Sequence, residues 1–329
     1  MKTAASSASI VVLLVLAGCS GGTPQNALPQ TGSEAPARGA TERAASGGLM
    51  ELFNLDYSNG SITVFSIQNG KAKQTAQFKP GGGVAQGLAA DAHGNIYTTI
   101  TKTNSKPCAA CAQIYTDTGN LVRSLDAPML QGAPNPPQLT DVSVDAHDNV
   151  YVSDYGQQAV YFFPHGKATK KGPTIVVQNS QNAASVLSTP DGNNVLISGG
   201  CGFASVAPFT RVSRGKYTQG TCFGIGTIAL LGGAVDDQED VMTPVDGVPG
   251  LVSVSSPTGG ETFQVPDHLG SISGVALNGD ASIAYVADAH KEVVYAFARP
   301  GSGWLSGTQP KLLATYKGFK KLDVIAVPQ

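Results

Sequence analysis

The stretch Asp141-Val-Ser-Val-Asp-Ala-His-Asp-Asn-Val-Tyr-Val-Ser-Asp-Tyr-Gly-Gln-Gln-Ala-Val-Tyr-Phe-Phe163 decides the fold. It holds three short apolar runs, separated by Asp-Ala-His-Asp-Asn and by Tyr-Gly-Gln-Gln. Valine, tyrosine and phenylalanine favour strands, whereas aspartate, asparagine and glycine favour tight turns. The stretch therefore predicts three successive strands joined by polar turns, and the second strand ends at Asp154.

Other parts of the chain repeat this pattern. The copies of its second half are Phe53–Phe65, Tyr151–Phe163 and Tyr285–Phe297, which align without a gap and end their first strand at Asp56, Asp154 and Asp288. The copies of its first half are Gly87–Tyr97, Asp141–Tyr151 and Gly274–Tyr285, with weaker copies at Ala184–Ile197 and Gly233–Met242. Self-similarity at about 40 to 50 residues is typical of repeat architectures.

The repeats predict an all-β fold, a six-bladed β-propeller. Units begin near residues 87, 141, 184, 233 and 274, and a sixth unit is split between the two ends of the chain. Residues 50–65 lack an opening strand, and residues 321–329 resemble one. We expect the C-terminal strand to pair with the N-terminal blade, which closes the ring and hides two strand edges.

The N-terminal residues predict export. A short apolar run from Ile10 to Leu16 follows Lys2 and is too short to span a bilayer. Leu16-Ala-Gly-Cys19 resembles the lipobox of bacterial lipoproteins. The resemblance implies cleavage before Cys19, acylation of this cysteine, and a lipid-anchored protein of the cell envelope, at the outer membrane. The alternative is an ordinary secretory peptide with a cysteine near its end.

The expected domains are a lipoprotein signal peptide at 1–18, a lipidated cysteine with a flexible tether at 19–48, and the β-propeller at 49–329. The tether has almost no large apolar side chains and cannot build a core. The whole chain has 21 Lys and Arg against 23 Asp and Glu, so loss of Lys2 with the signal leaves a formal charge of −3. This charge balance does not provide the positive electrostatic potential that binding of a nucleic-acid partner requires.

The repeat Gly/Asp-Val-x-x-Asp-x-x-Gly/Asp-Asn-Val-Tyr-Val-x-Asp resembles that of the NHL and SMP-30/gluconolactonase-like six-bladed propellers. The resemblance is clearest in the units that begin near residues 87, 141 and 274. It implies the fold, because the matching positions are framework positions. Gluconolactonase-like members hold a divalent metal in the channel with a glutamate, an asparagine and an aspartate, and the sequence does not place that set.

Four cysteines follow Cys19, and an even number in an exported chain favours disulfides. Cys201 and Cys222 flank a segment that we interpret as a hairpin turning near Ser213-Arg-Gly-Lys216, so they are expected to pair within the fourth blade. Cys108 and Cys111 form a CxxC in a long connection and are expected to form a structural disulfide. Thiol redox chemistry, a metal site and cross-pairing with Cys201 or Cys222 are the alternatives.

The aspartates that end the second strands share one face of the predicted ring. With their neighbours they are the candidate ligand-binding residues of the channel mouth: Asp56, Tyr57, Asp154, Tyr155, Asp288 and His290. The alternative is that each aspartate only caps its own turn. Asp91 and Asp145, in the other Asp-Ala-His triplets, are interpreted as turn residues. The acidic run Asp236–Asp240 is interpreted as a solvated turn, with calcium binding as the alternative.

The sequence leaves two function classes open and assigns no catalytic residue. It contains no GxSxG, HExxH or P-loop motif. The first class is a membrane-anchored propeller that binds a protein or small-molecule partner, without a cofactor. The second is a metal-dependent hydrolase, lactonase or lyase of the gluconolactonase-like type, for which Ca²⁺ or another divalent cation would serve as cofactor. An acidic cluster converging in the channel favours the enzyme.

Overall fold

The computed structural model describes residues 50–102, 110–133, 135–169, 172–178, 183–199, 201–202, 204–213, 216–225, 232–245 and 247–328. The segments expected to be a signal peptide and a tether, together with Cys19 and Cys108, lie outside these residues. Every described residue belongs to the second of the two units into which the chain divides, Ala37–Gln329. Within the described ranges, no helix is both long and apolar enough to cross a bilayer.

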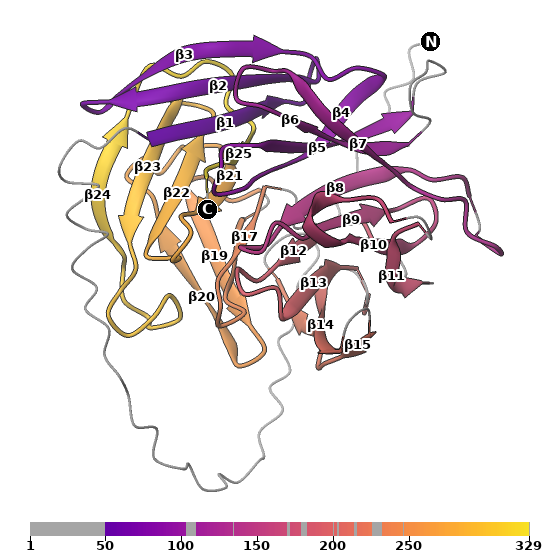
Figure 1. The fold of residues 1–329 in the computed structure, drawn as a ribbon. Coiled ribbons are helices and arrows are strands. Elements are labelled where there is room, and N and C mark those ends of the chain that lie inside the picture. Colours follow the sequence, from indigo (N-terminus) through magenta and orange to yellow (C-terminus); the bar gives the residue numbers. More distant parts are fainter. Residues whose placement is uncertain are drawn as a thin grey trace, which may run out of the picture. The chain divides into compact units, whose positions relative to one another are not determined.

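The second unit consists of six antiparallel sheets in chain order (Figure 1). The first sheet has the order β25 (Val324–Ala326), β1 (Met50–Asp56), β2 (Ser61–Gln68), β3 (Lys71–Phe78). The second has the order β4 (Gly83–Ala90), β5 (Ile96–Lys102), β6 (Cys111–Tyr115), β7 (Leu121–Asp126). The third has the order β8 (Leu139–Val144), β9 (Val150–Asp154), β10 (Ala159–Phe163), β11 (Thr174–Gln178), with the 3-10 turn η1 (Pro164–Gly166) after β10.

The other three blades follow the same plan. The fourth sheet has β12 (Val186–Ser188), β13 (Asn194–Ser198), β14 (Ser205–Ser213) and β15 (Lys216–Gln219), with β16 (Phe223–Gly224) also paired to β14. The fifth has β17 (Ala234–Val235), β18 (Val241–Pro244), β19 (Leu251–Ser256) and β20 (Gly259–Gln264). The sixth has β21 (Ile272–Leu277), β22 (Ile283–Asp288), β23 (Val293–Ala298) and β24 (Lys311–Tyr316). The expected six-bladed propeller is confirmed.

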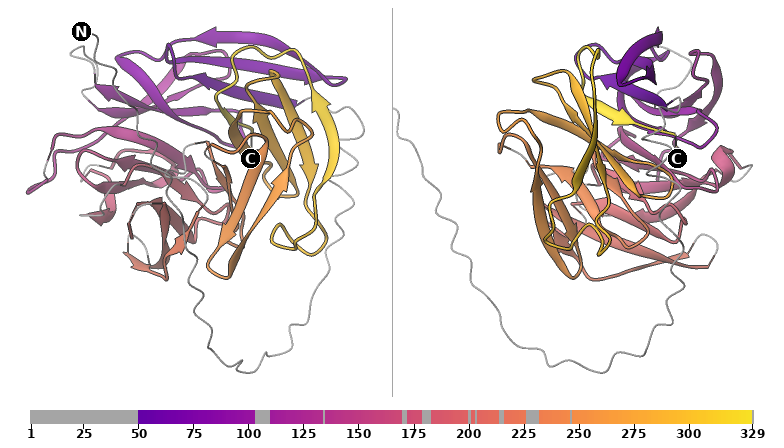
Figure 2. Two further views of the ribbon diagram at one scale, coloured as in Figure 1. Left: turned by 180° about the vertical axis from the view of Figure 1, so that it is seen from behind. Right: turned by 90° about the vertical axis from the view of Figure 1, so that its left-hand side faces the viewer.

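The C-terminal strand closes the ring as expected. β25 pairs antiparallel with β1 in the register Phe53 to Ala326 and Leu55 to Val324. In Figure 2 the yellow C-terminal strand accordingly lies at the edge of the first blade, beside its indigo strand β1. The innermost strands β25, β4, β8, β12, β17 and β21 each contact the next one around the ring, and β21 contacts β25 again. Closure thus joins the two ends of the sequence in one sheet.

The aspartate of each Asp-x-x-x-Asn turn holds the hairpin that opens its blade. In the third blade, Asp145 Oδ1 accepts from the backbone N–H groups of His147 and Asn149, both at 2.9 Å. Its Oδ2 accepts from the Asn149 amide at 2.8 Å. Asp91 makes the same contacts in the second blade, to His93 and Asn95. These side chains replace backbone partners that the turn lacks, which is the role interpreted from the sequence.

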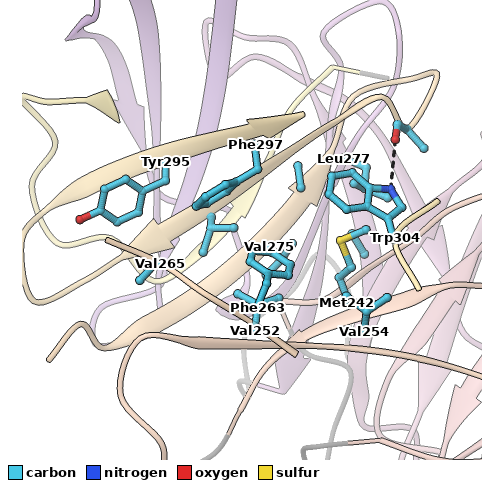
Figure 3. Packing of buried hydrophobic residues seen from close by; sticks show 14 of the residues in the cluster. Met242, Val252, Val254, Phe263, Val265, Val275, Leu277, Tyr295, Phe297 and Trp304 are labelled. Carbon is cyan, nitrogen blue, oxygen red and sulfur yellow. Dashed lines mark hydrogen bonds between the residues drawn. The ribbon is translucent and has the colours of Figure 1, made fainter. Parts of the chain in front are cut away.

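Apolar side chains join each blade to the next. Six buried hydrophobic clusters are found in the described residues, one between each pair of adjacent sheets. Figure 3 shows the cluster between the fifth and sixth blades, where Met242 and Phe263 meet Val275 and Phe297. The indole N–H of Trp304 donates to the Ala281 carbonyl oxygen at 3.2 Å (Figure 3). Each such buried side chain stabilises the ring by about 1.5 to 3 kcal/mol.

A disulfide joins Cys201 to Cys222, with 6.2 Å between their Cα atoms. Between them β14 and β15 form the hairpin interpreted from the sequence, with Ser213 paired to Lys216 at its tip. Cys111 is also disulfide-bonded, whereas Cys108 lies outside the described residues. The Cys201–Cys222 bond therefore joins the connection before β14 to the residues that follow β15.

We expect loss of the Cys201–Cys222 bond to lower the free energy of unfolding by about 3 kcal/mol, because it closes a loop of 21 residues in the unfolded chain. The measurement compares urea unfolding of the wild type with that of a Cys201→Ser, Cys222→Ser variant. The variant avoids a reductant, which would also open the disulfide of Cys111. Unchanged unfolding, or free thiols at both positions in peptide maps of the wild type, would contradict the expectation.

Candidate functional site

The three aspartates at the ends of the second strands lie at equivalent places in blades one, three and six. Asp56, Asp154 and Asp288 are all buried, at 5%, 0% and 0% exposure. Each accepts backbone N–H groups of its own turn: Asp56 from Ser58, Asp154 from Gln157, and Asp288 from His290 and Lys291. Capping is therefore part of the role of all three.

The six residues expected at the channel mouth do not form one cluster. No hydrogen bond or ion pair between described residues joins the aspartate of one blade to that of another. Tyr155 is 45% exposed and uses its backbone N–H to bond the Gln138 carbonyl oxygen. Tyr57 is largely buried, and His290 is exposed beside Asp267. The six residues thus lie in three separate turns, one in each of three blades, and ligand binding by them stays a prediction.

A different set of polar side chains lies at the end of the ring where the chain enters the innermost strands. Asp141 is the third residue of β8 and Ser273 the second of β21, while Ser185 and Asp323 directly precede β12 and β25. The backbone N–H of Tyr57 donates to Asp323 Oδ2 at 3.0 Å. We call Tyr57, Asp141, Ser185, Ser273 and Asp323 the channel-end group. Because all blades share one strand order, these residues lie at one end of the ring.

Asp141 links three blades. Its Oδ2 accepts the backbone N–H of Val186 in the fourth blade at 3.2 Å, and its Oδ1 accepts that of Val142 at 2.9 Å. On its other side lies Gly87 of β4, where an added Cβ would come within 2.7 Å of the Asp141 Cα. Only glycine permits this approach of β4 to β8. The glycine therefore helps bring the Asp141 carboxyl group to the ring's interior.

Burial governs the electrostatics of the channel-end group. Desolvation raises the pKa of Asp141 to about 8, although the two backbone N–H donors oppose the shift. Burial also raises the pKa of Asp323 and that of Tyr57, and the charges of Asp141 and Asp323 raise the Tyr57 pKa further. Near neutral pH the Asp141 carboxyl group is therefore largely protonated and can donate a hydrogen bond.

The group leaves hydroxyl groups unpaired. Among the described residues, the buried hydroxyl oxygens of Tyr57, Ser185 and Ser273 have no hydrogen-bond partner. An unpaired buried polar group costs about 1 to 3 kcal/mol, so three of them at one end of the ring need a functional or solvent partner. Together with the Asp141 carboxyl group, they can hydrogen-bond a polar molecule.

The structure also holds a possible metal-binding triad. One oxygen of Asp267, one of Asp288 and one ring nitrogen of His290 lie within 4.8 Å of one another. The channel metal set implied by the gluconolactonase-like resemblance does not fit, because the innermost strands as described carry no glutamate. The described innermost strands therefore do not supply the ligand set of that metal.

The opposite end of the ring carries an acidic cavity. Glu239 and Asp240 line it together with Ser256, Thr258 and Gly303, and its volume is about 380 Å³. Burial raises the pKa of Asp240 to about 6, and the nearby charge of Asp236 adds to this rise. Asp236 accepts from the backbone N–H groups of Gln238 and Asp240 and forms an ion pair with Arg299 at 2.9 Å. The acidic run is thus a turn capped by Asp236 and held by Arg299. The interpretation as a solvated turn is wrong for Asp236 and Asp240, which are 0% and 5% exposed.

No protein-family model and no curated protein matches the sequence. Among solved structures the chain is similar to a functionally unknown protein from Desulfotomaculum acetoxidans, with 13% identity, a TM-score of 0.49, and coverage of 85% of this chain and 89% of that one. It is also similar to a catalytically inactive virginiamycin B lyase from Staphylococcus aureus, solved with quinupristin (11% identity, TM-score 0.48, coverage 83% and 85%). A third similar structure is that of a putative 6-phosphogluconolactonase from Bacteroides fragilis, with 12% identity, a TM-score of 0.46, and coverage of 82% of this chain and 83% of that one. At these values the similarities carry no argument about activity.

Sequence reasoning missed Asp141, Asp323 and Asp267 as site residues. Asp141 stands in the quoted repeat, but the matching position in the second unit is Gly87, so the repeat itself gives no signal. Asp323 was assigned only to a closing strand, and Asp267 lies in a connection between two blades. A useful signal would have been a charged residue placed where other repeats have a small or apolar one.

Proposed function

We propose that this protein is a membrane-anchored protein of the cell envelope whose propeller binds a small neutral, polar ligand at the channel-end group. The observation that carries the proposal is the set of unpaired buried hydroxyl groups of Tyr57, Ser185 and Ser273 at the end of the ring that also holds the buried carboxyl group of Asp141. Binding sites commonly combine a few convergent polar groups with an otherwise apolar surround. The flanking clusters of the ring supply that surround.

The chemistry of the group favours hydroxyl-bearing or amide-bearing ligands. A hydroxyl group both donates and accepts, and the protonated Asp141 carboxyl group does the same. These groups match the alternating donors and acceptors of a sugar. A sugar that meets all of them would remove the cost of leaving three hydroxyl groups unpaired.

The binding test uses N-acetylglucosamine and glucose as probes and follows the melting temperature of the purified protein. A probe present at about 100 times its Kd stabilises the folded state by about 2.7 kcal/mol, so we expect a saturable rise in melting temperature. Tyr57→Phe and Ser273→Ala should abolish the rise. Tyr155→Phe is the matched control, because this exposed tyrosine is not in the group, and it should keep the rise. The absence of a rise with both sugars, or an equal rise in Tyr57→Phe, would refute the proposal.

The membrane anchor is part of the same proposal and is supported by the lipobox at Leu16–Cys19. Several acyl chains at about 0.8 kcal/mol per buried CH₂ hold a protein far more firmly than one chain. We expect Cys19→Ala to move the protein from the membrane pellet to the soluble fraction. Ser20→Ala serves as the control and should stay in the pellet. A Cys19→Ala protein that remains in the pellet with unchanged gel mobility would contradict lipidation.

A metal-dependent hydrolase or lyase is the second candidate, supported by the triad of Asp267, Asp288 and His290. Catalytic metal sites commonly have three protein ligands and one position open to water or substrate. The test is hydrolysis of a simple lactone by the metal-loaded protein, with His290→Ala as the inactive variant. Equal rates for the two proteins would exclude this candidate.

A further inference from the structure

The aspartate cap at the end of the second strand is complete in blades one and three and incomplete in blade six. In blade one the amide of Asn59 donates to Asp56 Oδ2 at 2.7 Å. In blade three the amide of Gln157, at the same position three residues later, donates to Asp154 Oδ2 at 2.9 Å. In blade six the equivalent residue is Lys291, and its ammonium group does not close the cap.

Lys291 instead contacts a second carboxylate. Its Nζ lies 3.2 Å from Asp267 Oδ1, and Asp288 Oδ2 has no hydrogen-bond partner among the described residues. Asp288 is 0% exposed, so this oxygen is a buried acceptor that the protein leaves unsatisfied. A buried unpaired carboxylate oxygen is costly, which indicates that something else satisfies it.

The neighbouring groups are of the kinds that ligate metal ions. Asp267 Oδ2 faces the ring Nδ1 of His290 at 3.3 Å, while Lys291 and the backbone N–H of Leu269 hold the other oxygen of Asp267. His290 stands where blades one and three have Ser58 and Gly156, so the imidazole is peculiar to this blade. The triad is therefore assembled at one of three equivalent turns.

A glycine keeps space open beside the unpaired oxygen. An added Cβ at Gly270 would lie 2.6 Å from Asp288 Oδ2 and 3.0 Å from the Asp267 carbonyl oxygen. Any other residue would fill this space. The space beside Gly270, the unpaired Asp288 Oδ2 and the side chains of Asp267 and His290 thus all favour a bound cation at this turn.

We propose that Asp267, Asp288 and His290 bind a divalent transition-metal ion of the Zn²⁺ type. Two carboxylates and one imidazole match the ligands of zinc, whereas Ca²⁺ and Mg²⁺ favour oxygen ligands alone. Because the His290 side chain is 57% exposed, the site is open to solvent and leaves a coordination position for water or a ligand. This metal site is independent of sugar binding at the channel-end group. The second candidate function, a metal-dependent enzyme, requires the metal site.

The test is equilibrium dialysis of the full chain, in its oxidised form, against Zn²⁺. We expect one bound ion per chain that His290→Ala and Asp288→Asn remove. Loss of a group that only orients a ligand weakens metal binding by about 10- to 100-fold, and loss of a ligand should cost at least as much. His290→Ala changes an exposed side chain, so the variant should fold.

Two matched control variants change equivalent residues of blade three. His147→Ala removes the histidine of the Asp-Ala-His triplet in blade three, and Asp154→Asn removes the cap equivalent to Asp288; both should bind Zn²⁺ like the wild type. Lys291→Ala should bind more tightly, because it removes a cation that competes for Asp267. No bound Zn²⁺, or binding that survives His290→Ala, would overturn the proposal, and neither result bears on sugar binding.

Discussion

A chain that ends at Phe319 should not fold, because it lacks the strand that closes the ring. Leu322, Val324, Ile325 and Val327 are only 1% to 5% exposed and pack between blades one, two and six. At about 1.5 to 3 kcal/mol for each buried side chain, their loss approaches the whole stability of an ordinary domain, about 5 to 15 kcal/mol. Circular dichroism and urea unfolding of the truncated protein provide the measurement.

The closing segment also supplies polar contacts that the truncation removes. The Asn54 amide donates to the Lys321 carbonyl oxygen at 3.0 Å, and the Asp323 backbone N–H donates to Asn54 Oδ1 at 2.8 Å. Without β25, the strand β1 becomes an exposed edge of its sheet. A chain ending at Val327 is the control and should unfold like the wild type. If the chain ending at Phe319 melted at the wild-type temperature, the closure would contribute no stability.

Asp141→Asn should change how stability depends on pH more than any other single substitution in the channel-end group. Burial raises the pKa of the Asp141 carboxyl group to about 8 in the folded protein, against the ordinary value of 3.8 for a solvated aspartate. Between these values the folded state holds a proton that the unfolded state releases. The contribution of Asp141 to stability therefore falls as pH rises from about 4 to 8, by roughly 1.4 kcal/mol per pH unit.

Urea unfolding at a series of pH values tests this expectation. Asparagine cannot ionise, so the free energy of unfolding of Asp141→Asn should not fall between about pH 4 and 8 on account of this residue. The difference in unfolding free energy between the variant and the wild type should therefore shift in favour of the variant as pH rises to about 8. Tyr57→Phe is the control, because it leaves the Asp141 carboxyl group in place and should retain the slope. Parallel curves for wild type and Asp141→Asn would show that the carboxyl group is hydrated and not buried.

The sequence by itself determined the architecture. The repeated strands end at Asp56, Asp154 and Asp288, and their spacing set six blades with a split first blade. This was possible because strand and turn preferences are local, and because a repeat shows the same local pattern several times. The hairpin between Cys201 and Cys222 followed from the same local reasoning.

Only the tertiary structure decided which polar groups meet and which stay unpaired. Asp56, Asp154 and Asp288 look alike in sequence, yet two have their Oδ2 satisfied by an amide three residues later and one does not. The difference involves Asp267, which lies in the connection between the fifth and sixth blades and forms an ion pair with Lys291. Likewise Asp141 acquires its raised pKa from burial between blades. Contacts between distant segments depend on ring closure and packing, which no local pattern encodes.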